Sequence, residues 1–356
     1  MSKNERSFWE GRAMPDRAAS ATPWPRIVAV VVVLAVAVGV VVLAFLWPTA
    51  TASPRELPVG IVASAPQTAA IESALDERAP GVIAVQDVAD RAAAVAAIER
   101  RELVGAIVLD PAPEVLVASA ASPAVAQLLG GLAPALGAQL AAAAAAAGID
   151  LDGPVSVAVT DVVPLAAGDE RGAIIAAASF PIVLGGILGG VAVGLLVRGT
   201  MRRLTALVAY AVVGASAVAA VLVGVFGALP GPIVAITAAI ALALLAIAGL
   251  VAGLAAVLGR PGIPLGAILV LLVANPLSAA AVPVEFLVAP WGAIGQWLPP
   301  GAGATLLRDV AYFPAADASF PWLVLAGWAA VGLILVALGR MRDVRRPADA
   351  GAAPAS

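Results

Sequence analysis

The chain has 356 residues, of which 62% are hydrophobic and only 12% are charged, and its formal net charge is −3. A mean hydropathy of +1.02 is far above that of soluble proteins, so the composition predicts an integral membrane protein. Cys and His are both absent, which excludes disulfides, thiolate or imidazole metal ligands and every Cys/His or Ser/His catalytic arrangement. We therefore expect the protein to have no metal, no cofactor and no enzymatic activity.

Six apolar runs are each long enough to cross a hydrocarbon core of roughly 30 Å as helices. They lie at residues 27–47, 173–197, 204–228, 232–258, 263–284 and 320–339. The middle four are closely spaced within residues 172–284. The sequence therefore predicts an α-helical integral membrane bundle of six transmembrane helices, with a domain inserted at residues 48–171 between the first and second helices.

The charges flanking these runs predict an orientation. The leader, residues 1–26, carries five basic residues, and they are Lys3, Arg6, Arg12, Arg17 and Arg26. Basic loops face the cytoplasm, so the N-terminus is expected there, and alternation places the arginines between later spans and the tail, residues 340–356, on the same side. The inserted segment has six Arg against fifteen Asp and Glu, a balance of −9, and falls outside. We expect a multi-pass protein of the inner or plasma membrane, with both termini cytoplasmic.

Three segments near these runs each allow two interpretations. Ala50-Thr51-Ala52 resembles a signal-peptide cleavage site, but the apolar run before it exceeds the roughly 7 to 15 residues of such a signal, which favours an uncleaved anchor. The leader fits either a short interfacial helix or a disordered tail. The Ala-rich run 128–147 is also nearly uncharged. Counting it as a span would put the Arg-rich tail outside, so a soluble helix is predicted.

The inserted segment alternates between strand and helix patterns. Strands are predicted at 57–64, 82–85, 106–109, 114–119 and 155–163, and helices at 66–78, from Asp87 or Asp90 to 102, and from Ser122-Pro123 to 148. This alternation predicts a compact extracytoplasmic α/β domain. It shows no Gly-rich phosphate cradle, basic stripe or aromatic platform, so nucleic acid is not an expected partner. A solvated surface is a simpler reading of its acidity than a ligand site.

Small residues recur at four-residue spacing on the second span. They are Gly185, Gly186, Gly189, Gly190 and Gly194. This spacing lets helix backbones approach closely, which fits either packing within the bundle or a dimer face. Packing within the bundle is the simpler interpretation, because Gly is common in membrane helices.

The segment 285–319 is too apolar for a solvated loop and too rich in proline for a span, which predicts an interfacial or re-entrant hairpin. Three residues here are candidates for substrate contact or gating. Asn275 precedes Pro276 and would either satisfy carbonyls freed by a kink or contact substrate. Glu285 would sit at the interface or act as a gate or proton site, and Arg308 with Asp309 would pair with it or with headgroups.

The same stretch carries a resemblance to a known family. Its motifs are Asn275-Pro276-Leu277-Ser278, the turn Leu298-Pro299-Pro300-Gly301, a short helix with Leu306, Leu307 and Arg308, and Tyr312-Phe313. They resemble the end of ABC type-2 exporter permeases. The layout of one span, a large outside domain and five further spans resembles the branch related to phage-infection-protein-like membrane proteins.

The resemblance implies the permease subunit of an exporter, a homodimer or heterodimer that moves a hydrophobic or amphipathic substrate. The chain has no GxxxxGK[ST] loop, so a separate cytoplasmic ATPase is expected as partner. The loop 198–204 is short for a helix that engages an ATPase, and the leader would supply more of that contact. The alternative is a non-transporting membrane protein whose outside domain binds an envelope partner or phage.

Overall fold

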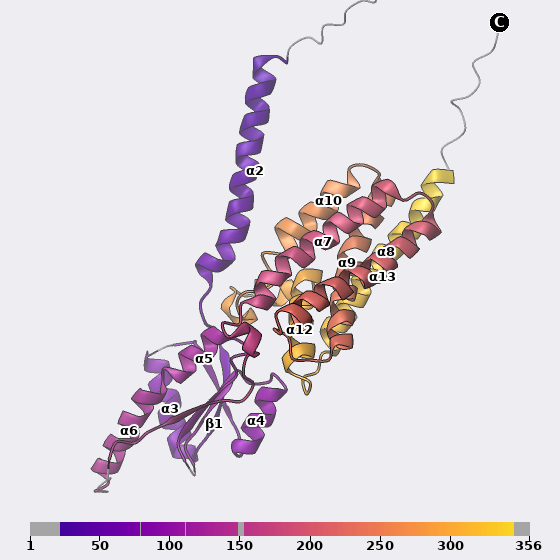
Figure 1. Ribbon diagram of the computed structural model, residues 1–356. Coiled ribbons are helices and arrows are strands. Elements are labelled where there is room, and N and C mark those ends of the chain that lie inside the picture. The colour runs from indigo at the N-terminus through magenta and orange to yellow at the C-terminus, as the bar shows by residue number, and fades with distance from the viewer. Residues whose placement is uncertain (1–21, 79, 111, 149–152, 345–356) are drawn as a thin grey trace, which may run out of the picture. The chain divides into compact units, whose positions relative to one another are not determined.

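The computed structural model describes residues 22–78, 80–110, 112–148 and 153–344 of the chain (Figure 1). Most of the predicted leader and the end of the predicted tail lie outside the described residues. The chain divides into two compact units, Met1–Leu46 and Trp47–Ser356.

The first unit consists mainly of helix α2 (Trp24–Thr51), whose last residues belong to the second unit. At about 1.5 Å per residue its 28 residues are long enough to cross a bilayer core. From Ile27 to Trp47 its sequence is apolar on every side. A helix of this length that is hydrophobic all round is typical of a membrane span.

The second unit begins with a five-stranded mixed sheet of order β2-β1-β3-β4-β5. Its strands are β1 (Leu57–Val62), β2 (Ile83–Asp87), β3 (Gly105–Val108), β4 (Glu114–Val117) and β5 (Ala158–Asp161). Strand β1 is parallel to β2 and β3, β4 is antiparallel to β3, and β5 is parallel to β4. All five strands overlap the predicted ones, which confirms the predicted strands and a small mixed sheet.

Alternate side chains of the sheet are buried on opposite faces, as a strand's period of two requires. Ala106 and Leu116 pack with Ile98 of helix α4 (Arg91–Glu99). On the other face, Ile107 and Val115 pack with the helix α5 (Pro123–Gly130). Helix α3 (Ala65–Arg78) connects β1 to β2. The sheet is thus covered on both faces.

Local signals placed the starts of these helices. The Asp90 carboxylate accepts a hydrogen bond from the Ala93 N–H at 2.7 Å and caps α4, and the Ser122 hydroxyl caps α5 by accepting from the Val125 N–H at 3.3 Å. The Ala-rich run forms two helices instead of the single one predicted, α5 and α6 (Ala133–Ala146). Pro134 has no N–H to donate to the carbonyl four residues before it, so a new helix begins there.

Six helices in the described residues are long and apolar enough to cross a membrane. They are Trp24–Thr51, Pro123–Ala146, Ile174–Leu196, Thr200–Val225, Ile233–Leu258 and Ser319–Gly339. Five of them coincide with predicted spans. The other, Pro123–Ala146, is α5 with α6. Its residues Val125, Leu129 and Ala133 pack against the sheet, as expected for a helix of the α/β domain.

The predicted fifth span, 263–284, is not one continuous helix. Helix α10 (Gly262–Ile268) continues through a π-helical stretch, η3 (Leu269–Ala274), and ends there. At about 1.5 Å per residue the apolar helix Gly262–Ala274 is about 20 Å long, short of a core of roughly 30 Å. Pro276 and Pro283 cannot donate the backbone hydrogen bonds that a continued helix needs.

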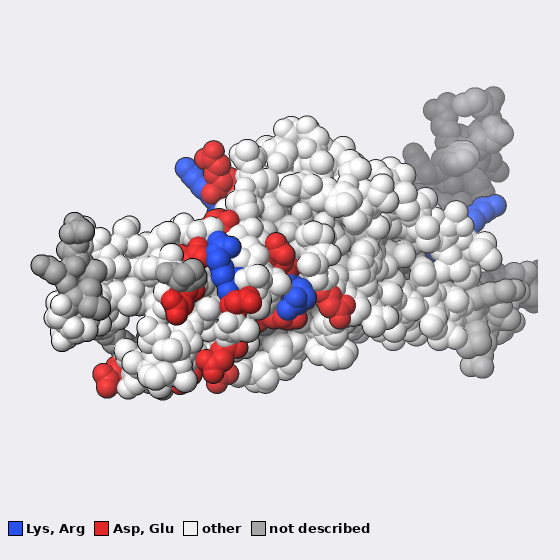
Figure 2. All heavy atoms as spheres, turned by 90° about the horizontal axis from the view of Figure 1, so that it is seen from below, with Lys and Arg blue, Asp and Glu red and all other residues white. Residues whose placement is uncertain are grey.

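The bundle is organised around helix α9 (Ile233–Leu258), which is the most buried of the long helices described. It contacts α10, α7 (Ile174–Leu196), α8 (Thr200–Ala219) and α13 (Ser319–Val344). Helix α8 also ends in a π-helical stretch, η2 (Ala220–Val225). Charged side chains gather on the part of the surface that holds the α/β domain, whereas the bundle surface in the same view is almost entirely uncharged (Figure 2).

Between η3 and α13 the chain forms short helices in place of a loop. They are η4 (Val284–Phe286), α11 (Trp291–Gln296) and α12 (Pro299–Tyr312). We call residues 275–318 the hairpin segment. Helix α12 packs against α9 and α13, and Leu306 and Leu307 are buried there.

Candidate functional site

The hairpin segment contains all three residues predicted to contact substrate or gate a path. The structure gives them different neighbours. Asn275 ends η3, where its N–H donates to the Val270 carbonyl at 2.9 Å and its own carbonyl accepts from the Ser278 N–H at 3.1 Å. Its backbone therefore shapes the turn out of the short helix.

Arg308 lies on α12 and is half-buried. Its Nη2 donates to the carbonyl of Ala280 at 3.4 Å, which ties α12 to the irregular stretch after Asn275. The predicted pairing of Arg308 or Asp309 with Glu285 is not among the ion pairs of the described residues. Arg308 is placed to hold the hairpin segment together.

Glu285 lies in η4 and is half-buried beside a groove that we call the hairpin groove. Its lining residues are Arg55, Glu56, Gly81, Val284, Glu285, Leu287, Ala289, Pro290, Gly292 and Ala293. One wall therefore comes from the start of the α/β domain and the other from the hairpin segment.

Arg55 joins these two walls. Its Nη1 donates to the carbonyls of Phe286 at 2.9 Å and Ser53 at 3.2 Å, and its Nη2 donates to the carbonyl of Thr51 at 3.4 Å. The Ser53 N–H also donates to the Phe286 carbonyl, at 3.1 Å. The end of α2 and the hairpin segment are thereby held together at this point.

A second junction connects the α/β domain to α12. Arg101, in the turn between α4 and β3, forms an ion pair with Asp309, whose side chain is only 6% exposed. The guanidinium also lies over the ring of Phe313, 5.4 Å from its centroid. Burial raises the pKa of Asp309, and the charge of Arg101 opposes that rise. The pair therefore stabilises a carboxylate that would otherwise be costly to bury.

Tyr312 ties the same end of α12 to the bundle, because its hydroxyl donates to the Ala228 carbonyl at 2.6 Å. Phe313 and Tyr312 share one core with Ile98 and Leu103 of the α/β domain and with Ile236 and Ile240 of α9. Domain and bundle consequently meet at a packed surface rather than through a flexible linker. This contact is between residues far apart in sequence.

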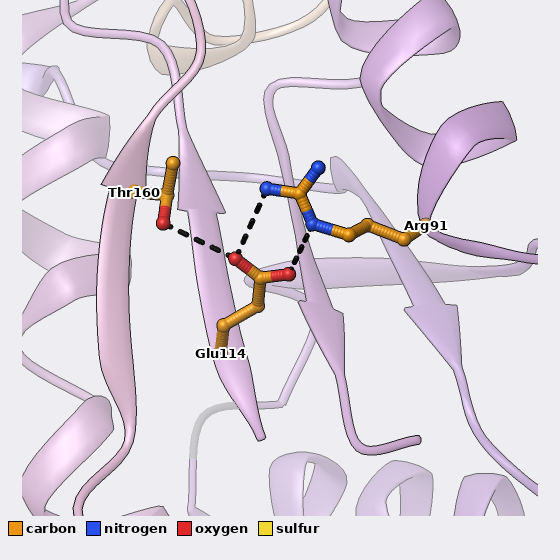
Figure 3. Close-up of polar contacts among 3 residues, drawn as sticks. All are labelled: Arg91, Glu114 and Thr160. Carbon is orange, nitrogen blue, oxygen red and sulfur yellow. Dashed lines mark hydrogen bonds and ion pairs between the residues drawn. The ribbon is translucent and has the colours of Figure 1, made fainter. Parts of the chain in front are cut away.

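The α/β domain carries a further polar cluster (Figure 3). Arg91 of α4 donates through Nε and Nη2 to the two carboxylate oxygens of Glu114 on β4, and Thr160 of β5 donates to the Glu114 Oε2 at 3.1 Å. The hydrogen bond from Arg91 is the main cause that lowers the pKa of Glu114. Each charged group has its partner, so the cluster clamps α4, β4 and β5 and lacks a reactive group.

The glycines of the predicted stripe lie on α7 and face α9 and α8. Added Cβ atoms at Gly186 and Gly190 would come within 2.8 Å of Ile247 and within 2.6 Å of the Ala248 carbonyl oxygen, both on α9. At Gly189 the ring of Tyr210 from α8 occupies that space, and its hydroxyl donates to the Gly185 carbonyl at 2.6 Å. The side of α7 that carries these glycines is therefore used within the bundle.

The interior of the bundle holds a small cavity of about 20 Å³ between α7, α9 and α12, with Ser179, Ala243 and Gly303 among its lining residues. This is room for about one water molecule. Among the described residues, no three acidic side chains lie close enough to hold a metal ion. Compared with this cavity, the hairpin groove, at about 400 Å³, is the larger candidate for a ligand.

Sequence reasoning identified Glu285 but missed Arg55 and Arg101. Arg-Arg-Glu at 100–102 is typical of a solvated turn, and nothing near it in the sequence points to a partner 208 positions away. Comparisons with known protein families, with curated proteins and with solved structures give no match.

Proposed function

We propose that this chain is the permease subunit of an ABC type-2 exporter, which moves a hydrophobic or amphipathic substrate across the membrane with a separate ATPase. The observation that carries the proposal is the hairpin segment. A short apolar helix, α10 with η3, is followed by α11 and then by α12, which packs on α9 and α13, before the last long helix. The motifs that resemble the end of ABC type-2 exporter permeases lie within this segment.

The order of the whole chain supports the same proposal. One long apolar helix precedes the α/β domain, and the bundle follows it. The junctions at Arg55 and Arg101 would let a movement of the hairpin segment reach the domain without a flexible linker. The chain lacks a phosphate-binding P-loop, so ATP hydrolysis would belong to the partner.

The arginines expected to face the cytoplasm offer a test of ATPase coupling. Arg198 and Arg202 are exposed beside the start of α8, whereas Arg203 donates to the carbonyls of Val197 and Gly194 at 2.8 and 3.2 Å and holds the turn. We expect the tagged chain, purified from native membranes, to carry an ATPase. The double variant R198E/R202E should lose most of that ATPase.

The matched control is R100E, which reverses an exposed Arg of the α/β domain and should leave ATPase recovery unchanged. ATP-dependent movement of an amphipathic dye in vesicles that hold both proteins would support the proposal directly. Native membranes that yield the chain without any ATPase would contradict it. That result would favour the non-transporting protein whose outside domain binds an envelope partner or phage.

A further inference from the structure

The hairpin groove has a cavity volume of about 400 Å³ and is open to the surface. Ligand sites in proteins are concave, mainly apolar and supplied with a few placed polar groups. Here the polar groups among the lining residues are Arg55, Glu56 and Glu285, and the apolar ones include Leu287 and Pro290. The groove therefore offers both a charged end and an apolar wall.

Its charge is not balanced by internal pairing. Within the part of the chain that the structure describes, neither Glu56 nor Glu285 belongs to an ion pair. Arg55 lines the same groove, but its guanidinium donates to three backbone carbonyls. Two carboxylates against one committed guanidinium leave the lining with an excess of negative charge. Glu285 is half-buried, so it gains from a cationic partner.

One member of an aromatic pair lies next to the groove lining in the chain. Trp291, between the lining residues Pro290 and Gly292, is 42% exposed. Its ring meets that of Trp47 edge to face, with centroids 6.3 Å apart. Tryptophan presents an apolar face with a polar edge and prefers the boundary between lipid and water. An apolar chain attached to a cation at the carboxylates would lie along Trp291.

We propose that the hairpin groove binds a cationic amphiphile, an organic ammonium group joined to an apolar body. The ammonium would lie against Glu56 and Glu285, and the apolar body would lie along Leu287, Pro290 and Trp291. Two carboxylates are too few to enclose a bare divalent cation, which takes six or more oxygen ligands in Ca²⁺ sites. Only the claim that this ligand is the transported substrate rests on the proposed function, since binding follows from the groove alone.

Binding is best measured without any ATPase, so that the two proposals fail separately. The probe is benzyltriethylammonium, titrated by calorimetry into the full chain in nanodiscs of zwitterionic lipid, with empty nanodiscs as the blank. Benzenesulfonate, an anion with a similar ring, is the comparison ligand. We expect saturable binding of the cation that weakens as salt is raised, and no saturable binding of the anion.

The variants E285Q and E56Q should each weaken binding of the cation by about five- to tenfold, the effect of removing one charge close to a partly desolvated ligand. E99Q, at an exposed position on α4, is the matched control and should bind as the unaltered chain does. Thermal unfolding of each variant checks that the fold is kept.

The results separate the two proposals. Equal binding of cation and anion, or E285Q and E56Q both binding as E99Q does, would overturn the groove proposal even if ATP-driven transport is found. Selective binding that depends on both carboxylates would support it, even in a chain that recruits no ATPase.

Discussion

Arg101 has a left-handed backbone, with φ of 60°, which side-chain-bearing residues seldom adopt and which favours glycine. Its guanidinium meets Asp309, in the last turn of α12, and the ring of Phe313, the residue that follows this helix. The ion pair and the ring contact offset the backbone cost at this turn. At the residue scale, this side chain is what joins the α/β domain to α12 electrostatically.

The first prediction concerns this pair. Arg101→Ala leaves the carboxylate of Asp309 buried without its partner and should lower the free energy of unfolding by about 2 kcal/mol. The loss is smaller than for a fully buried pair, because 26% of the Arg101 side chain is exposed to solvent. The measurement is urea unfolding of the full chain in detergent. R101A/D309N should recover part of the loss.

Arg100→Ala is the control, since Arg100 and Glu102 form an exposed pair, and it should change the free energy of unfolding little. Equal losses in both single variants would contradict the role of Arg101.

At the scale of elements, the bundle is packed by close backbone approach. Helix α7 meets α9 through glycines that leave no room for a side chain, while α9 itself is buried on most of its surface. Small residues allow this approach in membranes, where helix association depends on packing rather than on burial from water. The glycine stripe is therefore explained without a second copy of the chain.

The second prediction tests this packing one methyl group at a time. In Gly190→Ala the new Cβ would lie 2.6 Å from the Ala248 carbonyl oxygen, so the helices must separate, and we expect a loss of about 1 to 3 kcal/mol in stability. Gly194→Ala is the matched control on the same helix, because its nearest neighbour would be the Ala255 Cβ at 3.4 Å. The measurement is thermal unfolding in detergent. If G190A and G194A unfold at the same temperature, α7 and α9 are not packed as described.

At the scale of the whole molecule, the central question is which segments cross the bilayer. Length and hydropathy admit both Pro123–Ala146 and five further helices of the described residues as spans. Counting Pro123–Ala146 would also change the side on which every later loop lies. Its burial against the sheet favours a place in the α/β domain.

The third prediction settles this by labelling. The chain contains no Cys, so single Cys variants report one position each without any background. With a maleimide that cannot cross the membrane, we expect Glu99→Cys and Ala147→Cys to react in intact cells and Arg202→Cys to react only after lysis. All three positions are exposed, and all should react once the membrane is broken. If Ala147→Cys is protected in intact cells while Glu99→Cys reacts, α5 with α6 crosses the membrane.

Local sequence was enough to place the strands, the helix caps and five of the long apolar helices. Each of these depends on neighbours within a few residues or on the solvent preference of one continuous run, as with Asp90 capping α4 and the apolar run of α9. It also identified Glu285 as a candidate for substrate contact or gating. Prolines in the sequence mark the end of the short fifth helix and the break between α5 and α6. The sequence prediction nevertheless made both helices too long.

Which distant groups meet depends on the three-dimensional fold. Arg55 donates to a carbonyl 231 positions away, and Arg101 pairs with a carboxylate 208 positions away. Such pairs depend on how α/β domain, hairpin segment and bundle close on one another, and no local window of sequence encodes that closure. The hairpin groove arises for the same reason, because its two walls come from segments that are far apart in the sequence.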